Sequence, residues 1–449
     1  MSLTPTPAQL TGASFLSERR FALLGDEPRC GKTGAALLAW QRIGAPPLLV
    51  VTTASGVTVW HRAFKVWAPD QPIPLPLANK LVGLAEHFHV VIVPWSIIAR
   101  PLVRQALCSR RWGLVILDES HAAKAPEAAR TMACYGCGEA GIADAGDAVW
   151  CLTGTPVPNS PADLWPMLSA LWPDRLEPDD SQGWPDVTDY EAFVRRYCII
   201  HKRKVGKGFY AQWIRVIKGG KNVPELHARI AGIMLRRTQK EVGIPVPKYE
   251  MLPISISEGQ RKRLEKEAPP KLKTILEAMG QKAISDLDMH FGPLRRLTGS
   301  LKIAPLAQLV SDEIEGGYGK IVIMAWHTEV IEALAEALAK HGAVAVHGST
   351  PLKKRAELAD RFQADPECRV FVGQIQACGE AIDLSAANEL IFAETSFVPK
   401  DMTQAALRVT NLGKQADVRS RVAALADSID EMVQNVVVEK MKAIRELQE

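Results

Sequence analysis

Residues 24–37 read Leu-Gly-Asp-Glu-Pro-Arg-Cys-Gly-Lys-Thr-Gly-Ala-Ala-Leu, and they follow the apolar run Phe21 to Leu24. That run predicts a short buried strand, and the apolar residues from Ala35 to Trp40 predict a helix. A strand, a tight loop and a helix start bring backbone N–H groups and the positive end of the helix to one point, where phosphates bind. In such a loop Lys32 would reach a terminal phosphate and Thr33 would bind Mg²⁺.

This loop matches the phosphate-binding pattern G-x-x-x-x-G-K-[ST] imperfectly. Gly31 precedes Lys32 as the pattern requires, but Asp26 stands where the first glycine belongs and Gly25 comes one place early. Taken alone, Gly-Lys-Thr also fits an ordinary helix cap. Both interpretations therefore remain open at this point.

Length and composition set broad limits. A chain of 449 residues predicts two or three domains with an ample core. The 47% hydrophobic and 23% charged residues are typical of a globular protein, and a net charge of +4 permits an anionic partner without requiring one. No apolar run has membrane-spanning length, and the N-terminus lacks the pattern of a secretory signal.

The eight scattered cysteines favour a reducing cytosol, so we expect a cytoplasmic protein. Cys134 and Cys137 have C-x-x-C spacing, but no second pair follows at zinc-site spacing. The sequence therefore disfavours zinc.

Four further apolar runs in the first half of the chain predict buried parallel strands, and polar residues follow several of them. The strands are the apolar runs at Leu48 to Thr53, Val90 to Val93, Leu114 to Leu117 and Val149 to Leu152. Ligands bind at the carboxyl ends of such strands, where this chain carries Thr52, Thr53, Ser55 and Ser96. Upstream of the phosphate loop, the amide of Gln9 can hydrogen-bond adenine, although a solvated helix glutamine is at least as common.

The run Leu114 to Leu117 ends in Asp118-Glu119-Ser120-His121. An acid at the end of a buried strand can hold Mg²⁺, while its neighbour orients the attacking water. The alternative, an exposed Asp-Glu turn, is disfavoured by the apolar strand before it. The next strand ends in Thr153-Gly154-Thr155-Pro156, whose hydroxyls can relay between a nucleotide site and a second ligand, or simply form a turn.

The segment from Arg195 to Lys221 is strongly basic, with nine Lys or Arg and no Asp or Glu. Aromatic residues are interleaved, and Gly206 and Gly208 suggest a hairpin turn. This pattern fits an element that faces nucleic acid, through Lys202, Arg203, Lys204 and Lys207. A solvated basic hairpin is the alternative.

A second set of alternating strands and helices follows a hinge region at Pro245 to Ser257 and a charged helical stretch to Leu297. Its strands are expected at Lys320 to Ala325, Val344 to Val346, Arg369 to Val372 and Leu390 to Ala393. The fold class is therefore α/β, with two doubly wound parallel sheets. We expect a first lobe at 1–162, a helical and basic insertion at 163–245, a helical linker region at 246–300 and a second lobe at 301–449.

The order of the motifs resembles helicase superfamily two, and its details resemble the Swi/Snf-type DNA translocases. The series consists of Gln9, G-K-T at 31–33, T-T-A-S at 52–55, D-E-S-H at 118–121, T-G-T-P at 153–156, L-R-R-T at 235–238, G-E-A-I-D-L at 379–384 and Q-x-x-x-R at 404–408. Residues 321–334 with His327, and residues 370–387, resemble the annealing-helicase (HARP-like) branch. The resemblance covers nearly the whole chain and implies two RecA-like lobes.

The resemblance also implies roles for the motif residues. Adenine, phosphates and Mg²⁺ would be bound by Gln9, Asp26, Gly31, Lys32, Thr33 and Asp118, and Glu119 would activate water. Coupling of ATP to DNA would rest on His121, Thr153 and Thr155. The second lobe would be brought over the nucleotide by Gly379, Asp383 and Arg408. DNA would contact Thr52, Ser55, Ser96, His327 and the 374–380 loop around Gln374.

The chain departs from the family pattern at several positions. Arg29 and Cys30 replace the usual Gly-Leu, and Ser120 replaces an alanine. In the last motif, Asn411 stands where a second arginine is usual, and Lys414 replaces a glutamine.

The sequence thus predicts an ATP-dependent translocase on double-stranded or branched DNA that uses ATP and Mg²⁺ and has no membrane partner. Its role would lie in DNA remodelling, annealing, replication or recombination. Two alternatives stay open: an ATP-regulated nucleic-acid-binding module with weak turnover, motivated by Asn411, and an RNA-dependent ATPase of the same superfamily.

Overall fold

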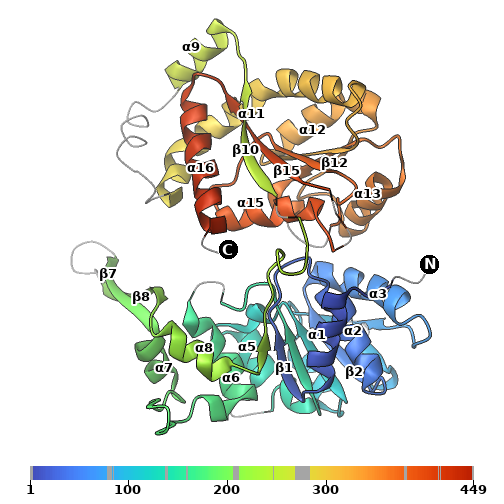
Figure 1. Ribbon diagram of the computed structural model, residues 1–449, viewed down its shortest axis with the longest axis vertical. Coiled ribbons are helices and arrows are strands. Elements are labelled where there is room, and N and C mark those ends of the chain that lie inside the picture. The colour runs from blue at the N-terminus through green and yellow to red at the C-terminus, as the bar shows by residue number, and fades with distance from the viewer. Residues whose placement is uncertain are drawn as a thin grey trace. The chain divides into compact units, whose positions relative to one another are not determined.

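The computed structural model describes residues 4–77, 83, 85–136, 140–157, 160–205, 212–245, 247–267, 284–378, 382–412, 414 and 416–446. The chain divides into two compact units, residues 1–242 and 243–449. Each unit contains its own parallel sheet (Figure 1). No helix in the described part of the chain is long and apolar enough to span a bilayer.

The first unit is built on a seven-stranded sheet in the order β3-β4-β2-β5-β6-β1-β9, in which every neighbouring pair is parallel. The strands are β1 (Phe21–Leu24), β2 (Leu48–Thr52), β3 (Leu75–Pro76), β4 (Val90–Pro94), β5 (Leu114–Asp118), β6 (Val149–Leu152) and β9 (Met234–Leu235). The five strands predicted for this half are present, and the short edge strands β3 and β9 are additional.

Helices cover both faces of this sheet because alternate strand residues point to opposite sides. On one face, Val50 and Ile116 pack with α1 (Pro7–Ser17), α2 (Lys32–Arg42) and α3 (Ala54–Trp67). On the other face, Val51 and Leu117 pack with α4 (Pro101–Cys108), α5 (Ala129–Tyr135), α6 (Trp165–Leu171), α7 (Tyr190–Tyr197) and α8 (Val223–Ile230). This is the doubly wound arrangement that the apolar runs predicted.

The basic segment forms an antiparallel hairpin, as its glycines suggested. Strand β7 (Cys198–Val205) pairs with β8 (Gln212–Gly220), and a bulge lies between Ile199 and Ile200. Lys202 is exposed on β7, and Trp213 on β8 is 65% exposed. Lys207 lies outside the described residues.

The second unit is built on a six-stranded parallel sheet in the order β10-β15-β14-β11-β13-β12. Its strands are β10 (Lys248–Ile254), β11 (Ile321–Ala325), β12 (Val344–Val346), β13 (Val370–Gln374), β14 (Glu389–Phe392) and β15 (Arg419–Leu425). The helices are α9 (Glu258–Glu267), α11 (Ile284–Glu315), α12 (Thr328–Ala337), α13 (Leu352–Ala364), α14 (Ile375–Cys378), α15 (Pro399–Ala406) and α16 (Ile429–Glu446). The four strands predicted here are present.

Two strands of the second sheet differ from the prediction. The segment expected to be a hinge and the start of a helical linker contains β10, which pairs with β15 over its whole length. Strand β10 lies at the sheet edge and carries Pro253, which an edge strand tolerates. Strand β15 was missed because its buried Arg421 interrupts the apolar pattern, and this guanidinium is paired with Glu313 and Glu389.

Candidate active site

The phosphate loop has the strand, turn and helix that its sequence predicted. Strand β1 ends at Leu24 and α2 begins at Lys32. Arg29 and Gly31 both adopt left-handed backbone, with φ of 71° and 79°. Glycine accepts this conformation without cost, whereas Arg29 carries strain. Because the first turn of α2 has N–H groups without intrahelical acceptors, the loop presents donors and a positive helix end at one place.

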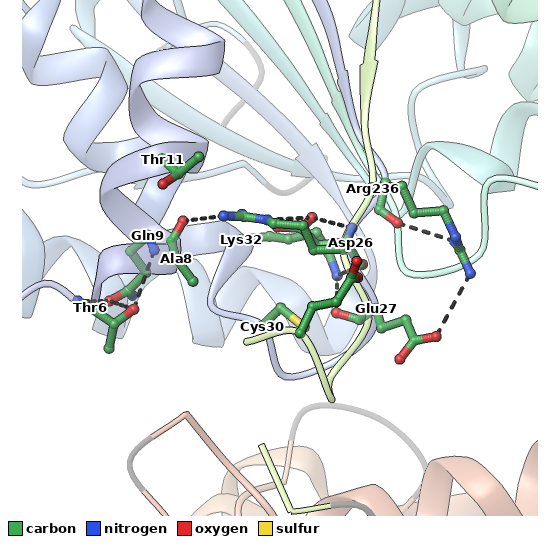
Figure 2. Close-up of polar contacts among 12 residues, drawn as sticks. Thr6, Ala8, Gln9, Thr11, Asp26, Glu27, Cys30, Lys32 and Arg236 are labelled. Atoms are coloured by element: carbon green, nitrogen blue, oxygen red, sulfur yellow. Dashed lines mark hydrogen bonds and ion pairs between the residues drawn. The ribbon is translucent and has the colours of Figure 1, made fainter. Parts of the chain in front are cut away.

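Lys32 points back over this loop. Its Nζ atom donates to the carbonyl oxygens of Asp26 at 2.6 Å and Glu27 at 3.0 Å (Figure 2). Thr33 follows as the second residue of α2. Burial raises the pKa of the neighbouring Cys30 thiol to about 12, so this cysteine is a neutral packing residue.

Strand order brings the other predicted residues to the same edge of the sheet. Strands β5, β6 and β1 are neighbours, so Asp118, Thr153 and the phosphate loop follow three adjacent carboxyl ends. The Thr153 N–H donates to the carbonyl of Leu24 at 3.1 Å. A Cβ atom on Gly154 would lie 3.0 Å from the ring of Pro28, so the glycine permits the T-G-T-P turn to pack against the loop.

Asp118 is a buried carboxylate whose pKa is raised. Its Oδ2 atom accepts hydrogen bonds from Thr52 Oγ1 at 2.7 Å and Trp60 Nε1 at 2.8 Å. Its pKa is raised to about 6, chiefly by burial and also by the charge of Glu119, while the two hydrogen bonds and Lys32 oppose the rise. Because both donors reach Oδ2, Oδ1 is the oxygen that would face a cation.

The prediction that Thr52 contacts DNA is wrong. Its side chain is 0% exposed and donates to Asp118. A fully buried hydroxyl cannot meet a phosphate backbone, and its role is to support the carboxylate. Ser55 lies in the first turn of α3 beside Thr53, with their hydroxyl oxygens 3.1 Å apart, and Ser96 is exposed after β4. Their contacts with DNA remain predictions.

Glu119 and His121 lie beside the two threonines of the T-G-T-P turn. Glu119 has left-handed backbone at φ 51°, which turns the chain sharply after β5. His121 Nδ1 lies 2.9 Å from Thr153 Oγ1, 3.5 Å from Thr155 Oγ1 and 3.3 Å from a Glu119 carboxylate oxygen. The structure thus brings together the residues predicted to couple hydrolysis to DNA, and the coupling itself stays a prediction.

The side chain of Asp26, which was predicted to belong to the nucleotide site, contacts another part of the protein instead. Its carboxylate is fully buried and contacts Arg237 through both oxygens. A carboxylate that faced a phosphate would repel it, and here Asp26 instead fixes the loop to another segment of the unit. Gln9 is also largely buried, and its Oε1 accepts from the Thr6 N–H at 3.0 Å in a capping box, so its contact with adenine stays a prediction.

In the second unit, His327 follows β11 and Gln374 is the last residue of β13. His327 Nδ1 lies 2.6 Å from the buried carboxylate of Glu394, which also accepts the backbone N–H groups of Trp326 and His327. Gln374 was predicted to contact DNA, but its amide joins two backbone segments, with Nε2 donating to Trp326 O at 2.9 Å and Oε1 accepting from Gly348 N at 2.7 Å. Its contact with DNA stays a prediction.

The last motif has a different environment from the one its sequence suggested. Arg408 lies in a short turn, and its carbonyl accepts from the Leu384 N–H at 2.9 Å; Asp383, which precedes Leu384, is exposed. Asn411 Nδ2 donates to Ser385 Oγ at 2.7 Å. Lys414 donates to the carbonyls of Ser385, Ala387 and Val409, and burial lowers its pKa to about 8. Gly379 lies outside the described residues.

The residues at this edge of the sheet fit a site that binds phosphate together with a partly hydrated Mg²⁺ ion. Among the described residues no three His, Cys, Asp or Glu side chains gather closely enough to cage a metal ion. Mg²⁺ needs no such cage, because it retains waters and takes substrate phosphate oxygens alongside one or two protein ligands. Thr33 and Asp118 supply a hydroxyl and a carboxylate of that kind.

Comparison with known families agrees with this geometry. Residues 8–298 match the SNF2-related domain, and residues 302–413 match the helicase conserved C-terminal domain. The chain belongs to the SNF2-related family. The predicted resemblance to Swi/Snf-type helicases near the annealing-helicase branch is confirmed.

Relatives in this family are longer than the chain. It is 25% identical over 438 residues to the Mus musculus protein named DNA annealing helicase and endonuclease ZRANB3, covering 95% of this chain and 39% of that protein. It is 26% identical over 466 residues to the Caenorhabditis elegans homolog of SWI/SNF-related matrix-associated actin-dependent regulator of chromatin subfamily A-like protein 1, covering 98% and 61%. The chain therefore spans less than two thirds of these relatives.

Among solved structures, the chain is similar to the Sulfolobus solfataricus SWI2/SNF2 ATPase core in complex with dsDNA. The TM-score is 0.44 at 18% identity, covering 100% of this chain and 96% of that chain.

Several functional residues of this SNF2-related chain were not found from the sequence. Trp60 was not assigned a role, yet its indole N–H donates to Asp118. Trp95 likewise donates from Nε1 to the Asp118 carbonyl at 2.7 Å. Arg237 was noted only as part of L-R-R-T, and Glu394 was not noted at all. No local sequence pattern marked these contacts, because each joins segments that are far apart in the chain.

Proposed function

We propose that this chain is a cytosolic, ATP-dependent translocase on double-stranded DNA. The observation that carries the proposal is that the phosphate loop, which follows β1, and Asp118 and Glu119, at the end of β5, lie at the same edge of the sheet on either side of β6. Membership in the SNF2-related family supports it, because the members are helicase-like ATPases. The lobe boundaries at 1–162, 163–245, 246–300 and 301–449 belong to the proposal.

The motif residues of the first unit carry out separate tasks in ATP hydrolysis. Lys32 and the N–H groups of α2 hold the phosphates. Asp118 and Thr33 hold Mg²⁺, which when bound would neutralise charge on the transferred phosphoryl group. Glu119 lies next to Asp118 and orients and deprotonates the attacking water. Arg408 and Asp383 contribute from the last motifs, as the resemblance implies.

Contact with DNA is proposed to rest on phosphates, without sequence readout. The hairpin β7–β8 supplies exposed Lys202 and a Trp213 side chain that is 65% exposed. Lysines beside an exposed aromatic ring suit a phosphate backbone with bases or sugars alongside. The relatives named DNA annealing helicase support DNA as the partner.

The catalytic assignment is tested by ATP turnover with duplex DNA, single-stranded DNA and RNA as separate stimulants. Lys32→Ala should weaken ATP binding, and Glu119→Gln should bind ATP without hydrolysing it. Stimulation mainly by RNA would favour the RNA-dependent ATPase. Normal ATP binding with no stimulated turnover would favour the regulated binding module, and normal turnover by Glu119→Gln would refute the role of Glu119.

The hairpin assignment is tested by the salt dependence of DNA binding. Neutralising Lys202, Arg203, Lys204 and Lys207 together should flatten the plot of log affinity against log salt by up to about 3.6, or about 0.9 per phosphate contact. Neutralising the exposed Lys262 and Arg263 of α9 serves as the control. An unchanged slope in the hairpin variant would leave only a solvated basic hairpin.

A further inference from the structure

A segment that follows the basic hairpin and α8 lies along the whole first half of the phosphate loop. We name residues 234–239 the loop clamp. Its start, β9, pairs with β1, so that Leu24 lies opposite Leu235. The backbone pairing then continues past the strands, because Gly25 N donates to Leu235 O at 2.8 Å and Glu27 N donates to Arg237 O at 3.0 Å. The loop therefore has a continuous backbone partner.

Arg237 is the central side chain of the loop clamp. Its backbone N–H and Nε donate to Asp26 Oδ1 at 3.0 and 3.1 Å, and one terminal nitrogen contacts Asp26 Oδ2. The other terminal nitrogen donates to Ala8 O at 2.7 Å. Asp26 is 0% exposed, so this is a buried, charge-assisted contact. One guanidinium thus ties the phosphate loop to α1, the helix that carries Gln9.

Two neighbours extend the same attachment. Gln239 is 4% exposed, its backbone N–H donates to Glu27 Oε2 at 2.9 Å, and its Nε2 donates to Pro28 O at 2.8 Å. Arg236 donates to Gly25 O at 3.2 Å (Figure 2). Every residue from Gly25 to Pro28 is thereby held by the loop clamp through its backbone, its side chain or both.

The residues that are held also set the place of Lys32. The two carbonyl groups that accept from its ammonium belong to Asp26 and Glu27, the residues whose carboxylates contact Arg237 and Gln239. A shift of this backbone would move the Lys32 ammonium and the turn at Gly31 together. Phosphate affinity depends on both, and sub-ångström placement of such groups matters.

We propose that Arg237, assisted by Gln239, is a positioning residue for nucleotide binding. It holds the first half of the phosphate loop in the conformation in which Lys32 and the start of α2 meet phosphates, and it fixes that loop to the helix that bears Gln9. This inference rests on the proposed nucleotide site. A merely structural Arg237 would hold the sheet edge without affecting nucleotide affinity.

The test compares Arg237→Lys with a matched control in the same unit. Lysine keeps the charge but cannot reach Asp26 and Ala8 together. Arg229 is a second buried arginine, which caps the carbonyls of Arg175, Glu177 and Pro185 and has no role in the proposed site. Thermal midpoints and equilibrium ADP affinity are measured for the full chain, with Lys32→Ala as the reference for a lost phosphate contact.

Arg237→Lys should weaken ADP binding about tenfold or more, whereas Arg229→Lys should lower the thermal midpoint and leave ADP affinity unchanged. ADP binding by Arg237→Lys at the native affinity, while Lys32→Ala binds poorly, would overturn the inference alone. Equal weakening by both arginine variants would also overturn it. A native protein that does not bind ADP would instead refute the proposed function. If Arg237→Lys does not fold, the double variant Asp26→Asn with Arg237→Gln replaces it, since no charge is then left buried.

Discussion

Thr52→Val is expected to raise the pKa of Asp118 and to move the acid limit of activity toward neutral pH. The substitution removes one of the two hydrogen bonds to Asp118 Oδ2, at 2.7 Å, from a residue that is 0% exposed. A hydrogen bond to a charged group contributes about 1.5–3 kcal/mol. At about 1.36 kcal/mol per pKa unit, the loss corresponds to one or two units.

The starting value decides how visible the change is. The pKa of Asp118 is about 6, chiefly because of burial. A rise to about 7 or 8 lowers the ionised fraction at pH 7 from roughly nine-tenths to between about one-half and one-tenth. Because only the carboxylate binds Mg²⁺ well, turnover should fall by a similar factor at pH 7 and recover at about pH 9.

The assay is the pH profile of kcat/KM for ATP with duplex DNA, since this ratio reports ionisations of the free enzyme. Thr58→Val, at an exposed threonine of α3, is the control. An acid limit that stays in place, or an activity loss that persists at about pH 9, would refute the support of Asp118 by Thr52.

The same shift has a consequence for stability, with the opposite sign from that of an ordinary ion pair. The pKa of Asp118 rises from 3.8 to about 6 on folding, so the native state binds more protons in that interval. The free energy of unfolding should therefore decrease as pH rises from about 4 to about 6. In Thr52→Val this decrease should continue to about pH 7 or 8.

Two further substitutions test other parts of the chain. Asn411→Arg should raise DNA-stimulated turnover, by up to the roughly 10³- to 10⁵-fold of an arginine finger, with little change in ATP affinity. Lys414 cannot substitute while it donates to three carbonyls. A native protein that turns over as fast as the variant would contradict this. Lys302→Met should lower the free energy of unfolding of the second unit, measured by urea denaturation, by about 3–5 kcal/mol. The reason is that Asp430, which is fully buried and 2.8 Å from Lys302, would lose its cation. A loss of less than about 1 kcal/mol would contradict this prediction.

Local pattern alone determined the α/β class and much of the site. Short continuous runs rich in β-branched residues, such as Leu114 to Leu117, favour strands buried on both faces, and glycine at position 31 suits the turn that starts a helix. The D-E-S-H and T-G-T-P stretches were placed correctly because they directly follow such runs. Since carboxyl ends of neighbouring parallel strands share one edge, sequence was enough to predict that these stretches would meet.

Only the tertiary structure decided what the polar side chains contact. Asp26 and Arg237 are separated by 211 positions, and no local pattern couples them. Thr52 looks the same in sequence whether its hydroxyl faces DNA or Asp118, and burial alone decides for Asp118. Strand β10 lacks an apolar run because it lies at a sheet edge, and β15 places a buried, paired arginine ahead of its apolar residues Val422 to Leu425. A buried polar group must find a partner, and which partner it finds depends on how distant segments pack.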